Sequence, residues 1–314
     1  MGRIFCIAEN AYSPTPFANL PLTIPDGRFG VVSQQQNIAN SNYSGLVLGV
    51  KHDFKGGLAF QASYTYSHGL DEISNNSVSP FGTNTFGRYA DVINPQDATN
   101  LAKYNYGNAD YDIRHNFSMN YVWNDGIRHL TAKGPNVLVK GWTFSGTIFR
   151  HSGLPFTVVD AAATTNLENT NYGPGGGTQS VFADVLGPRT NSCGASAATL
   201  TGAGCLDAAN FATPTDNWGQ QRRNQFRGPG YFNTDFAVEK GFGIPKWETA
   251  QFSIGARFFN VFNHPNFAFP IMIYGASGFG RIVQTVSSPT SIYGSGLGAD
   301  ASPRLIQLQA KFTF

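Results

Sequence analysis

The sequence predicts an all-β protein: an antiparallel up-and-down transmembrane β-barrel, present here as a partial barrel of about seven or eight strands with long extracellular loops. Three observations predict this fold. Segments of about ten residues alternate between apolar and polar side chains. The composition is rich in aromatic residues and poor in charge, and short turns alternate with long polar connections along the chain. A tilted strand of about ten residues is long enough to cross a bilayer.

The alternation is clearest in residues 303–314, where every second side chain is apolar. Side chains in a strand point to opposite faces in turn, so one face of this segment carries Ile306, Leu308, Ala310, Phe312 and Phe314. The other face is mostly polar. A strand with one apolar and one polar face is typical of a barrel wall between lipid and lumen.

Six earlier segments repeat the pattern. Together with the last one, the predicted strands cover residues 43–54, 57–68, 113–124, 139–150, 229–240, 249–262 and 303–314. In the second of them, Leu58, Phe60 and Ala62 oppose a face that carries Gln61 and Ser63. The connections run short, long, medium, long, short and long, which is typical of barrels with short periplasmic turns and long outer loops.

The composition supports a membrane location for these strands. Charged residues make up 13% of the chain, about half the usual share of soluble domains, and there are 26 Phe and 13 Tyr. No apolar run approaches the length of a membrane helix, so any span consists of strands. The net charge of +2 is too small to indicate nucleic-acid binding.

Residues 1–42 are predicted to be an irregular extracellular-loop region with one weak strand at 28–36. No secretory signal is recognisable at the N-terminus, because its apolar stretch is too short. Bacterial single-chain barrels have an even number of strands, so two possibilities follow. Either 28–36 is an eighth strand, or the chain lacks the front of a larger barrel. The long loops and the missing signal favour the second.

Few residues suggest a chemical site. Cys193 and Cys205 are predicted to form a disulfide within an outer loop, with two free thiols as the alternative, and Cys6 is left over. The histidines lack metal-ligand spacing and are expected at strand ends or turns: His52, His68, His115, His129, His151 and His264. We predict no catalytic residue, no cofactor and no metal, and therefore no enzyme.

Charged side chains suggest two further contacts. Arg222, Arg223 and Arg227 form a basic cluster that either faces lipopolysaccharide phosphates or an anionic ligand, or simply lies in solvent, which the composition of the loop favours. Glu239 and Arg257 lie on the polar faces of neighbouring predicted strands. We expect these two to form an ion pair in the barrel wall or to contact a plug.

Several segments resemble one family. They are residues 42–46 (NYSGL), 62–68 (ASYTYSH), 111–117 (YDIRHNF), 227–233 (RGPGYFN), 258–267 (FFNVFNHPNF) and the terminal Phe314. In this order they resemble the C-terminal third of Oar-like TonB-dependent outer-membrane receptors, which carry a carboxypeptidase-regulatory-like domain in front. The resemblance runs from about residue 28 to 314.

The resemblance implies a location in the outer membrane of a Gram-negative cell, in a 22-stranded barrel around a plug. This chain shows no plug and no TonB box, so we expect a fragment that reaches the TonB system only through the missing N-terminal part. The implied partners are outer-membrane lipid, an unknown nutrient ligand and the barrel-assembly machinery. That machinery reads a C-terminal signal, here Leu308, Ala310, Phe312 and Phe314.

The residues bear on three possible functions. The first is a receptor fragment that binds and imports a nutrient. The alternative is a stand-alone small outer-membrane barrel with a structural or adhesive role, which needs 28–36 to pair with 303–314. A secreted enzyme or carbohydrate-binding domain needs clustered carboxylates or aromatic residues on one face, and the carboxylates of this chain are dispersed. Unpaired strand edges and a wide apolar band predict aggregation in water without detergent.

Overall fold

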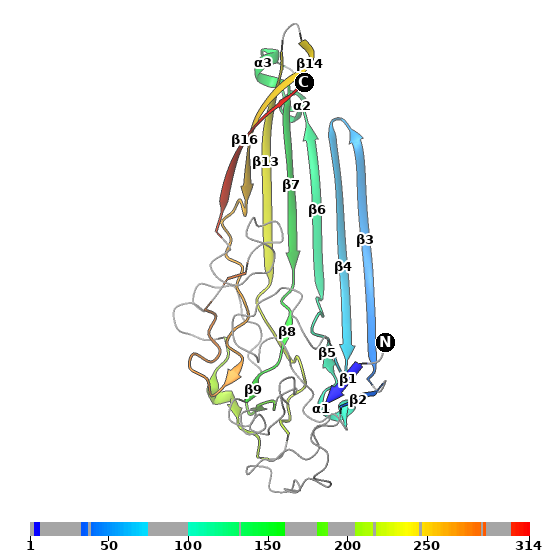
Figure 1. Ribbon diagram of the computed structural model, residues 1–314, viewed down its shortest axis with the longest axis vertical. Helices are drawn as coiled ribbons and strands as arrows, with labels where there is room; N and C mark the ends of the chain where they lie inside the picture. The colour runs from blue at the N-terminus through cyan, green and yellow to red at the C-terminus, as the bar shows by residue number, and fades with distance from the viewer. Residues whose placement is uncertain are drawn as a thin grey trace.

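One large antiparallel sheet dominates the structure (Figure 1). The computed structural model describes residues 3–6, 33–36, 39–74, 100–131, 133–160, 181–187, 205–215, 218–244, 247–283, 285–286 and 303–314. The long strands are β3 (Ser41–Lys55), β4 (Leu58–Asp71), β6 (His115–Asn124), β7 (Trp142–His151), β13 (Tyr231–Ile244), β14 (Trp247–Phe259) and β16 (Leu305–Thr313). They pair in the order β16-β14-β13-β7-β6-β4-β3, and β5 (Gly107–Asn108) adds to β4. The predicted antiparallel all-β fold is confirmed.

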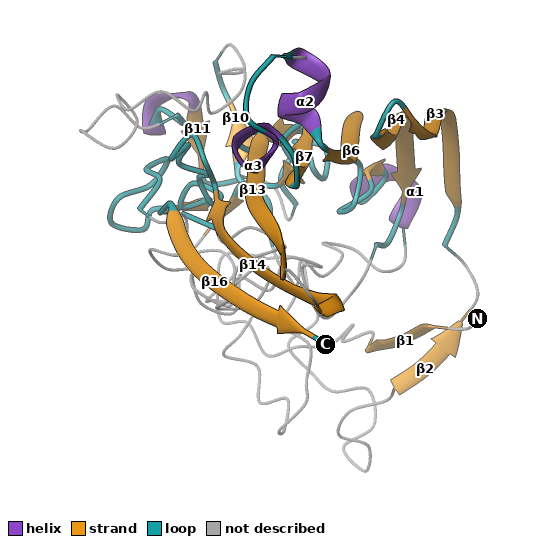
Figure 2. Ribbon diagram, turned by 90° about the horizontal axis from the view of Figure 1, so that it is seen from above, coloured by secondary structure: helices purple, strands orange, loops and turns teal. Residues whose placement is uncertain are grey.

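The sheet curves without closing among the described residues. From above, it forms an open wall with β3 at one edge and β16 at the other (Figure 2). Successive strands are antiparallel, so these two edge strands, at the ends of a path of seven, run in the same direction. An antiparallel barrel therefore requires an odd number of further strands between them.

The weak strand predicted at 28–36 does not fill this gap. The part of it that the structure describes, β2 (Ser33–Gln36), pairs with β1 (Arg3–Cys6) in a separate two-stranded sheet. The small-barrel alternative required pairing between this segment and the terminal strand. Neither β1 nor β2 pairs with β16 among the described residues.

Pairing in register gives the large sheet one apolar and one polar face. The apolar face carries Leu46, Leu48, Val50, Phe60, Ala62, Tyr64, Phe117, Met119, Tyr121, Trp123, Phe144, Ile148, Phe236, Val238, Phe252, Ile254, Ala256, Phe258, Ile306, Leu308, Ala310 and Phe312. The polar face carries mainly Ser, Thr, Asn, Gln and charged side chains, such as Gln61, Asn120, Thr147, Glu239 and Lys311. The register shifts beside two turns, between His52 and Lys55 and between Gly243 and Ile244. A one-residue shift along a whole strand would move its apolar side chains to the other face.

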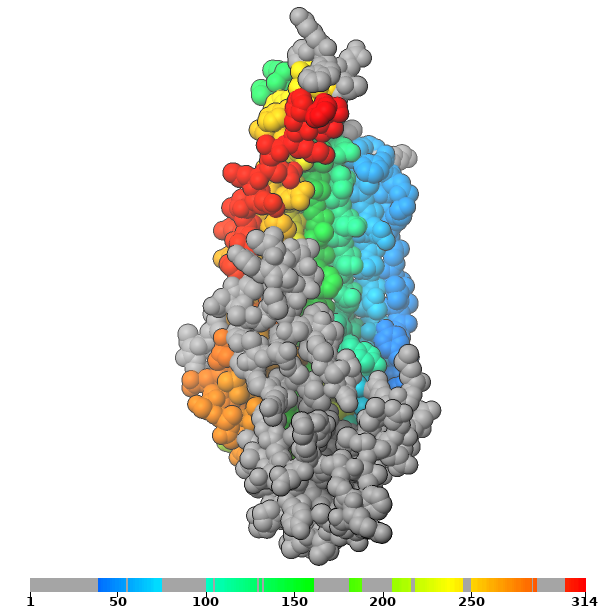
Figure 3. Space-filling view, viewed as in Figure 1, coloured from blue at the N-terminus to red at the C-terminus, as the bar shows by residue number. Residues whose placement is uncertain are grey.

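Aromatic side chains stack across the apolar face. Ring centroids lie 6.2 Å apart for Trp123 and Phe144, 6.1 Å for Phe144 and Phe236, and 6.3 Å for Phe236 and Phe258. These ring contacts connect the four neighbouring strands β6, β7, β13 and β14, in addition to the backbone hydrogen bonds between them. The space-filling view shows the strands side by side from β3, in blue, to β16, in red (Figure 3).

The hairpin between β13 and β14 is tighter than predicted. A turn was expected over residues 241–248, but Gly241 and Gly243 still pair with β14, and β13 ends at Ile244. The glycines interrupt the side-chain alternation without removing the backbone groups that pair. A pattern read from side chains therefore ended this strand too early.

Two other strands are shorter than predicted, one at its C-terminal end and one at its N-terminal end. The segment 249–262 stops being a strand at Phe259, because Asn260 takes a left-handed backbone with φ of 49°. The segment 139–150 begins with the last residue of helix α3 (Asn136–Val139). The predicted ranges 43–54, 57–68, 113–124 and 303–314 overlap β3, β4, β6 and β16.

Short elements fold at the two ends of the sheet. The helices are α1 (Leu101–Tyr104), α2 (Gly126–Leu130), α3 and the 3₁₀ helix η3 (Ala208–Asn210). The short strands pair as β8 (Pro155–Phe156) with β12 (Phe226–Arg227), β10 (Asp184–Val185) with β11 (Phe211–Ala212), and β9 (Val159–Asp160) with β15 (Ile273–Tyr274). None of the helices in the described part of the chain has the length and hydropathy of a membrane-spanning helix.

The outer loops have an apolar core of their own. The sequence suggested only long polar connections here. Instead, buried side chains from several loop segments pack together: Phe156, Val158, Ala183, Leu206, Phe211, Phe226, Phe267, Met272 and Ile282. These residues are scattered through irregular segments and two-residue strands, which are too short to show a strand period, so the alternation pattern missed them.

Gly146 provides a test of the strand packing. A Cβ atom at this position in β7 would lie 2.5 Å from the Asp235 carbonyl oxygen and 2.8 Å from Tyr121 Oη. We expect Gly146→Ala to destabilise the folded protein in detergent by about 1–3 kcal/mol through overpacking. The temperature at which the folded band disappears from a semi-native gel measures this. Gly49→Ala is the control, because nothing lies within 4 Å of its Cβ position, and equal effects would contradict the packing.

Candidate functional site

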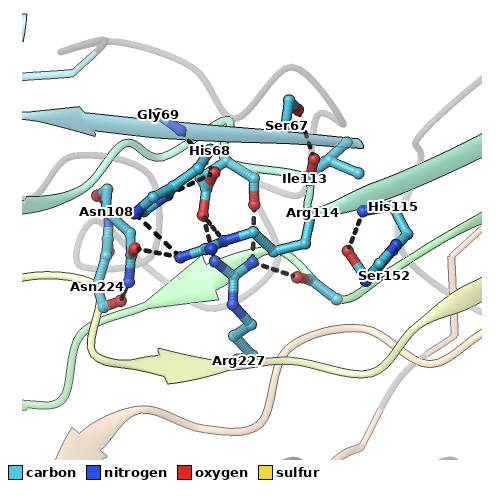
Figure 4. Close-up of polar contacts among 12 residues, drawn as sticks. Ser67, His68, Gly69, Asn108, Ile113, Arg114, His115, Ser152, Asn224 and Arg227 are labelled. Atoms are coloured by element: carbon cyan, nitrogen blue, oxygen red, sulfur yellow. Dashed lines mark hydrogen bonds and ion pairs between the residues drawn. The ribbon is translucent and has the colours of Figure 1, made fainter. Parts of the chain in front are cut away.

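A cluster of polar side chains, with His68, Arg114 and Arg227 close together, lies at the loop end of the sheet (Figure 4). At its centre is Asp112. Its carboxylate, which has no exposed side-chain surface, accepts hydrogen bonds from the Gly69 backbone N–H at 2.8 Å and from Arg114 Nε at 3.0 Å. Arg227 also donates to it. His68 Nδ1 lies 3.3 Å from the carboxylate and its Nε2 lies 3.2 Å from Arg114 Nη2. A neutral His68 with its proton on Nδ1 satisfies both contacts.

The Asp112 cluster holds a carboxylate in its charged form. Burial raises the pKa of Asp112, but the Gly69 N–H, the Arg227 guanidinium and Arg114 together outweigh it. The pKa of Asp112 therefore lies below its ordinary value. This carboxylate has two arginine partners and is not available to bind a metal cation.

A second cluster surrounds Arg223, which is buried. Its guanidinium forms ion pairs with Asp71 and, at 2.9 Å, with Asp110. It also donates to Ser74 Oγ at 3.1 Å and to the Asn105 carbonyl oxygen at 3.0 Å. A buried arginine with all of these acceptors is a structural anchor, because its charge is already compensated.

Asn224 links the two clusters to the neighbouring backbone. It has a left-handed backbone conformation with φ of 54°. Its Nδ2 donates to the Asn108 carbonyl oxygen at 2.8 Å, and Asn108 Nδ2 donates to the Asn224 carbonyl oxygen at 2.7 Å. Thr157 Oγ1 accepts from the Asn224 N–H at 2.7 Å. We name the set Asp71, Asp110, Asp112, Arg114, Arg223, Asn224 and Arg227 the loop-end network.

The loop-end network joins three parts of the chain that are far apart in sequence. These are the end of β4, the segment between β5 and β6, and the segment around β12. The arginine cluster predicted to face an anion or solvent is thereby corrected. Arg223 and Arg227 bind carboxylates of this chain, and only Arg222 is exposed. The acidic partners lie more than a hundred residues away, so local composition did not indicate them.

The predicted ion pair between Glu239 and Arg257 is wrong. Register places Glu239 opposite Gly255, and Glu239 Oε2 accepts a hydrogen bond from Gln309 Nε2 at 2.8 Å. No ion pair joins Glu239 and Arg257, both of which the structure describes. Gln309 reaches Glu239 from β16, across Gly255 of the intervening strand β14.

The polar face also carries unpaired acceptors. The side-chain oxygens of Asn116 and Asn233 are buried and have no hydrogen-bond partner among the described residues. Both belong to the loop ends of β6 and β13, which flank β7. A buried amide oxygen without a partner is costly, so these two positions are candidates for contact with a ligand or a further part of the protein.

The C-terminal residues predicted as an assembly signal lie on the apolar face of β16. Leu308, Ala310 and Phe312 pair with Ala256, Ile254 and Phe252. Leu308 and the terminal Phe314 are exposed, at 80% and 82% of their surface. Their recognition by the barrel-assembly machinery stays a prediction.

The predicted disulfide is only partly within the described structure. Cys205 is disulfide-bonded, and Cys193 lies outside the described residues, so the Cys193–Cys205 pairing stays a prediction. No group of three or more His, Cys, Asp or Glu side chains suited to a metal ion occurs in the described part of the chain. His68 and His115 take part in hydrogen bonds at strand ends.

The buried Arg223 gives a prediction for loop stability. Arg223→Met leaves the Asp71 carboxylate buried without its cation, which costs about 3–5 kcal/mol. We expect rapid cleavage of the outer loops by added protease, with the strands still protected by detergent. Arg222→Met is the matched control, because Arg222 is exposed. Equal cleavage rates for the two variants would contradict the anchoring role.

Asp112 gives a prediction for pH dependence. Its lowered pKa stabilises the folded loops at neutral pH, and this contribution is lost as pH falls below the ordinary carboxyl value of about 3.9 towards the lowered value. The hydrogen-exchange protection factor of the segment around β5, which corrects for the slower intrinsic exchange in acid, should therefore fall on acidification. In Asp112→Asn the protection factor should be lower at neutral pH and depend less on pH. Asp53→Asn, at an exposed position, should behave like the unaltered protein.

The comparison with known proteins agrees with this architecture. A family model described as "Outer membrane beta barrel domain" matches residues 7–307. No curated protein and no solved structure matches the chain significantly. The match spans nearly all of the sequence and supports the predicted location in the outer membrane. With its antiparallel sheet and its apolar and polar faces, the chain belongs to the outer membrane beta barrel domain family.

Proposed function

We propose that this chain forms the C-terminal wall and outer loops of an Oar-like TonB-dependent receptor, which binds a scarce nutrient and imports it. One observation carries the proposal. The two edge strands of the open sheet, β3 and β16, run in the same direction, and the face between them is polar. Such a sheet is suited to be one section of a wide barrel with a polar lumen.

The organised loops support a binding role. The loop-end network and the apolar loop core fix the segments above the sheet in defined positions. Binding residues in proteins are commonly carried by loops on a rigid scaffold. Below them, the unpaired oxygens of Asn116 and Asn233 offer acceptors to a polar nutrient or to a plug.

The proposal includes specific partners. Outer-membrane lipid surrounds the apolar face, and the barrel-assembly machinery reads Leu308, Ala310, Phe312 and Phe314. The TonB system is coupled through a part of the receptor outside this chain. We propose neither an enzymatic activity nor a nucleic-acid partner.

A stand-alone small barrel with a structural or adhesive role is the second candidate. The observation that favours it is the compact apolar core of the outer loops. An adhesive surface needs ordered loops but no passage through the barrel. The two candidates differ in how far apart the edge strands lie when the barrel is closed.

The distance between the edge strands tests the proposal. Spin labels on non-natural amino acids at Val50 and Leu308 mark β3 and β16 in outer membranes of the native host. Labels at Val50 and Met119 are the reference, because those strands flank β4 and are separated by about 10 Å. We expect the first distance to exceed the reference by a wide margin.

Equal distances would mean that one strand joins β3 to β16, as in a small barrel, and would overturn the receptor proposal. Measurement of nutrient uptake tests the function itself. Cells with and without the chain are compared for import of labelled ferric chelates, cobalamin and oligosaccharides. Import that depends on the chain should stop when a protonophore removes the energy that TonB uses.

A further inference from the structure

A groove lies on the apolar face at the loop end of the sheet. Its volume is about 810 Å³ and it extends across the ends of β4, β6, β7 and β13. Tyr64, Phe117 and Phe232 form apolar walls, and Arg150 lies in register between the two phenylalanines. The groove therefore places one cation inside an aromatic border, where the apolar band meets the outer loops.

The described residues that line the groove include one arginine, Arg150, and no Asp or Glu. The exposed Arg150 guanidinium has no hydrogen bond or ion pair to another described residue. Three histidines line the groove with Arg150: His115, His151 and His264. His151 Nδ1 is hydrogen-bonded to the Ser152 carbonyl oxygen at 2.7 Å. His115 is hydrogen-bonded to Tyr64 Oη at 2.7 Å through Nδ1. His264 packs edge-on against Phe232, and its buried Nδ1 has no partner in the described part of the chain.

Lys240 is another cation of this face, and it has partners within the protein. Arg150 and Lys240 lie on the apolar face of the paired strands described, at opposite ends of the band. The Lys240 ammonium donates to the Lys140 carbonyl oxygen and lies 5.2 Å from the Trp142 ring centroid. Lys240 is satisfied within the protein, whereas the charge of Arg150 is open to an external anion.

We propose that this groove binds the phosphorylated headgroup of an outer-leaflet lipid. The inference rests on membership of the outer-membrane barrel family, which directs the apolar face to lipid and the long loops outward. The planar guanidinium of Arg150 donates two parallel hydrogen bonds to phosphate oxygens. The aromatic walls contact the upper acyl chains, and His264 Nδ1 offers a further polar contact. Basic pockets at the membrane surface bind anionic headgroups in this way.

Native mass spectrometry of the full chain in zwitterionic detergent tests the site. The probes are bis-phosphorylated lipid A, the same lipid after removal of both phosphates, and inorganic phosphate. We expect the phosphorylated lipid to bind about tenfold more tightly than the dephosphorylated one, as charge-assisted hydrogen bonds suggest. Arg150→Gln should abolish this preference. Arg222→Gln, at an exposed loop position outside the groove, should retain it.

Three results would overturn the proposal. They are an unchanged preference in Arg150→Gln, equal binding of the two lipids to the unaltered protein, and displacement of the lipid by inorganic phosphate at equal concentration. The last result would indicate a general anion site. A heat-modifiable gel shift reports folding of each variant. If Arg150→Gln does not fold, Arg150→Lys and His264→Phe replace it, and each should bind the phosphorylated lipid more weakly, while unaltered binding in both would refute the site.

Discussion

Continuous backbone pairing between neighbouring strands is the constraint on which the rest of this structure depends. A membrane offers no water to satisfy exposed N–H and C=O groups, so each strand must bond to its neighbours along its length. The same register places every second side chain on one face. One geometric relation thus satisfies the backbone and separates an apolar surface from a polar one. A shift by a single residue in any strand would expose polar groups to lipid.

The outer loops are held by a different kind of interaction. Long irregular segments have no repeating backbone hydrogen-bond pattern that holds them in place. Contacts between specific side chains hold them instead. Arg223 and Asp112 each bind several partners from distant segments, and the apolar loop core excludes water beside them. Low solvent access strengthens these ion pairs, and it also makes each one costly to break. The loops are therefore ordered by a few contacts, whereas the sheet is ordered by many.

The two ends of the apolar face differ in a way that matters for function. Lys240, near the short turns, has hydrogen-bond and cation–π partners within the chain, while Arg150, below the outer loops, has no hydrogen bond or ion pair among the described residues. Long cationic side chains commonly mark the boundaries of a membrane band. Here the asymmetry distinguishes a cation with a structural role from one that is open to lipid. The polar face has a similar distinction between Glu239, which is paired, and the oxygens of Asn116 and Asn233.

The sequence by itself determined the sheet, because a period of two is a local property that each strand carries in its own residues. The faces of 303–314 and the barrel class followed from that period. Strand ends were less accurate where backbone conformation decided them, as at Asn260. Only the tertiary structure showed that Arg222 is exposed whereas Arg223 is buried. It also placed Arg150 and His264 in the same groove. Those relations depend on contacts between segments far apart in the chain, which no local pattern encodes.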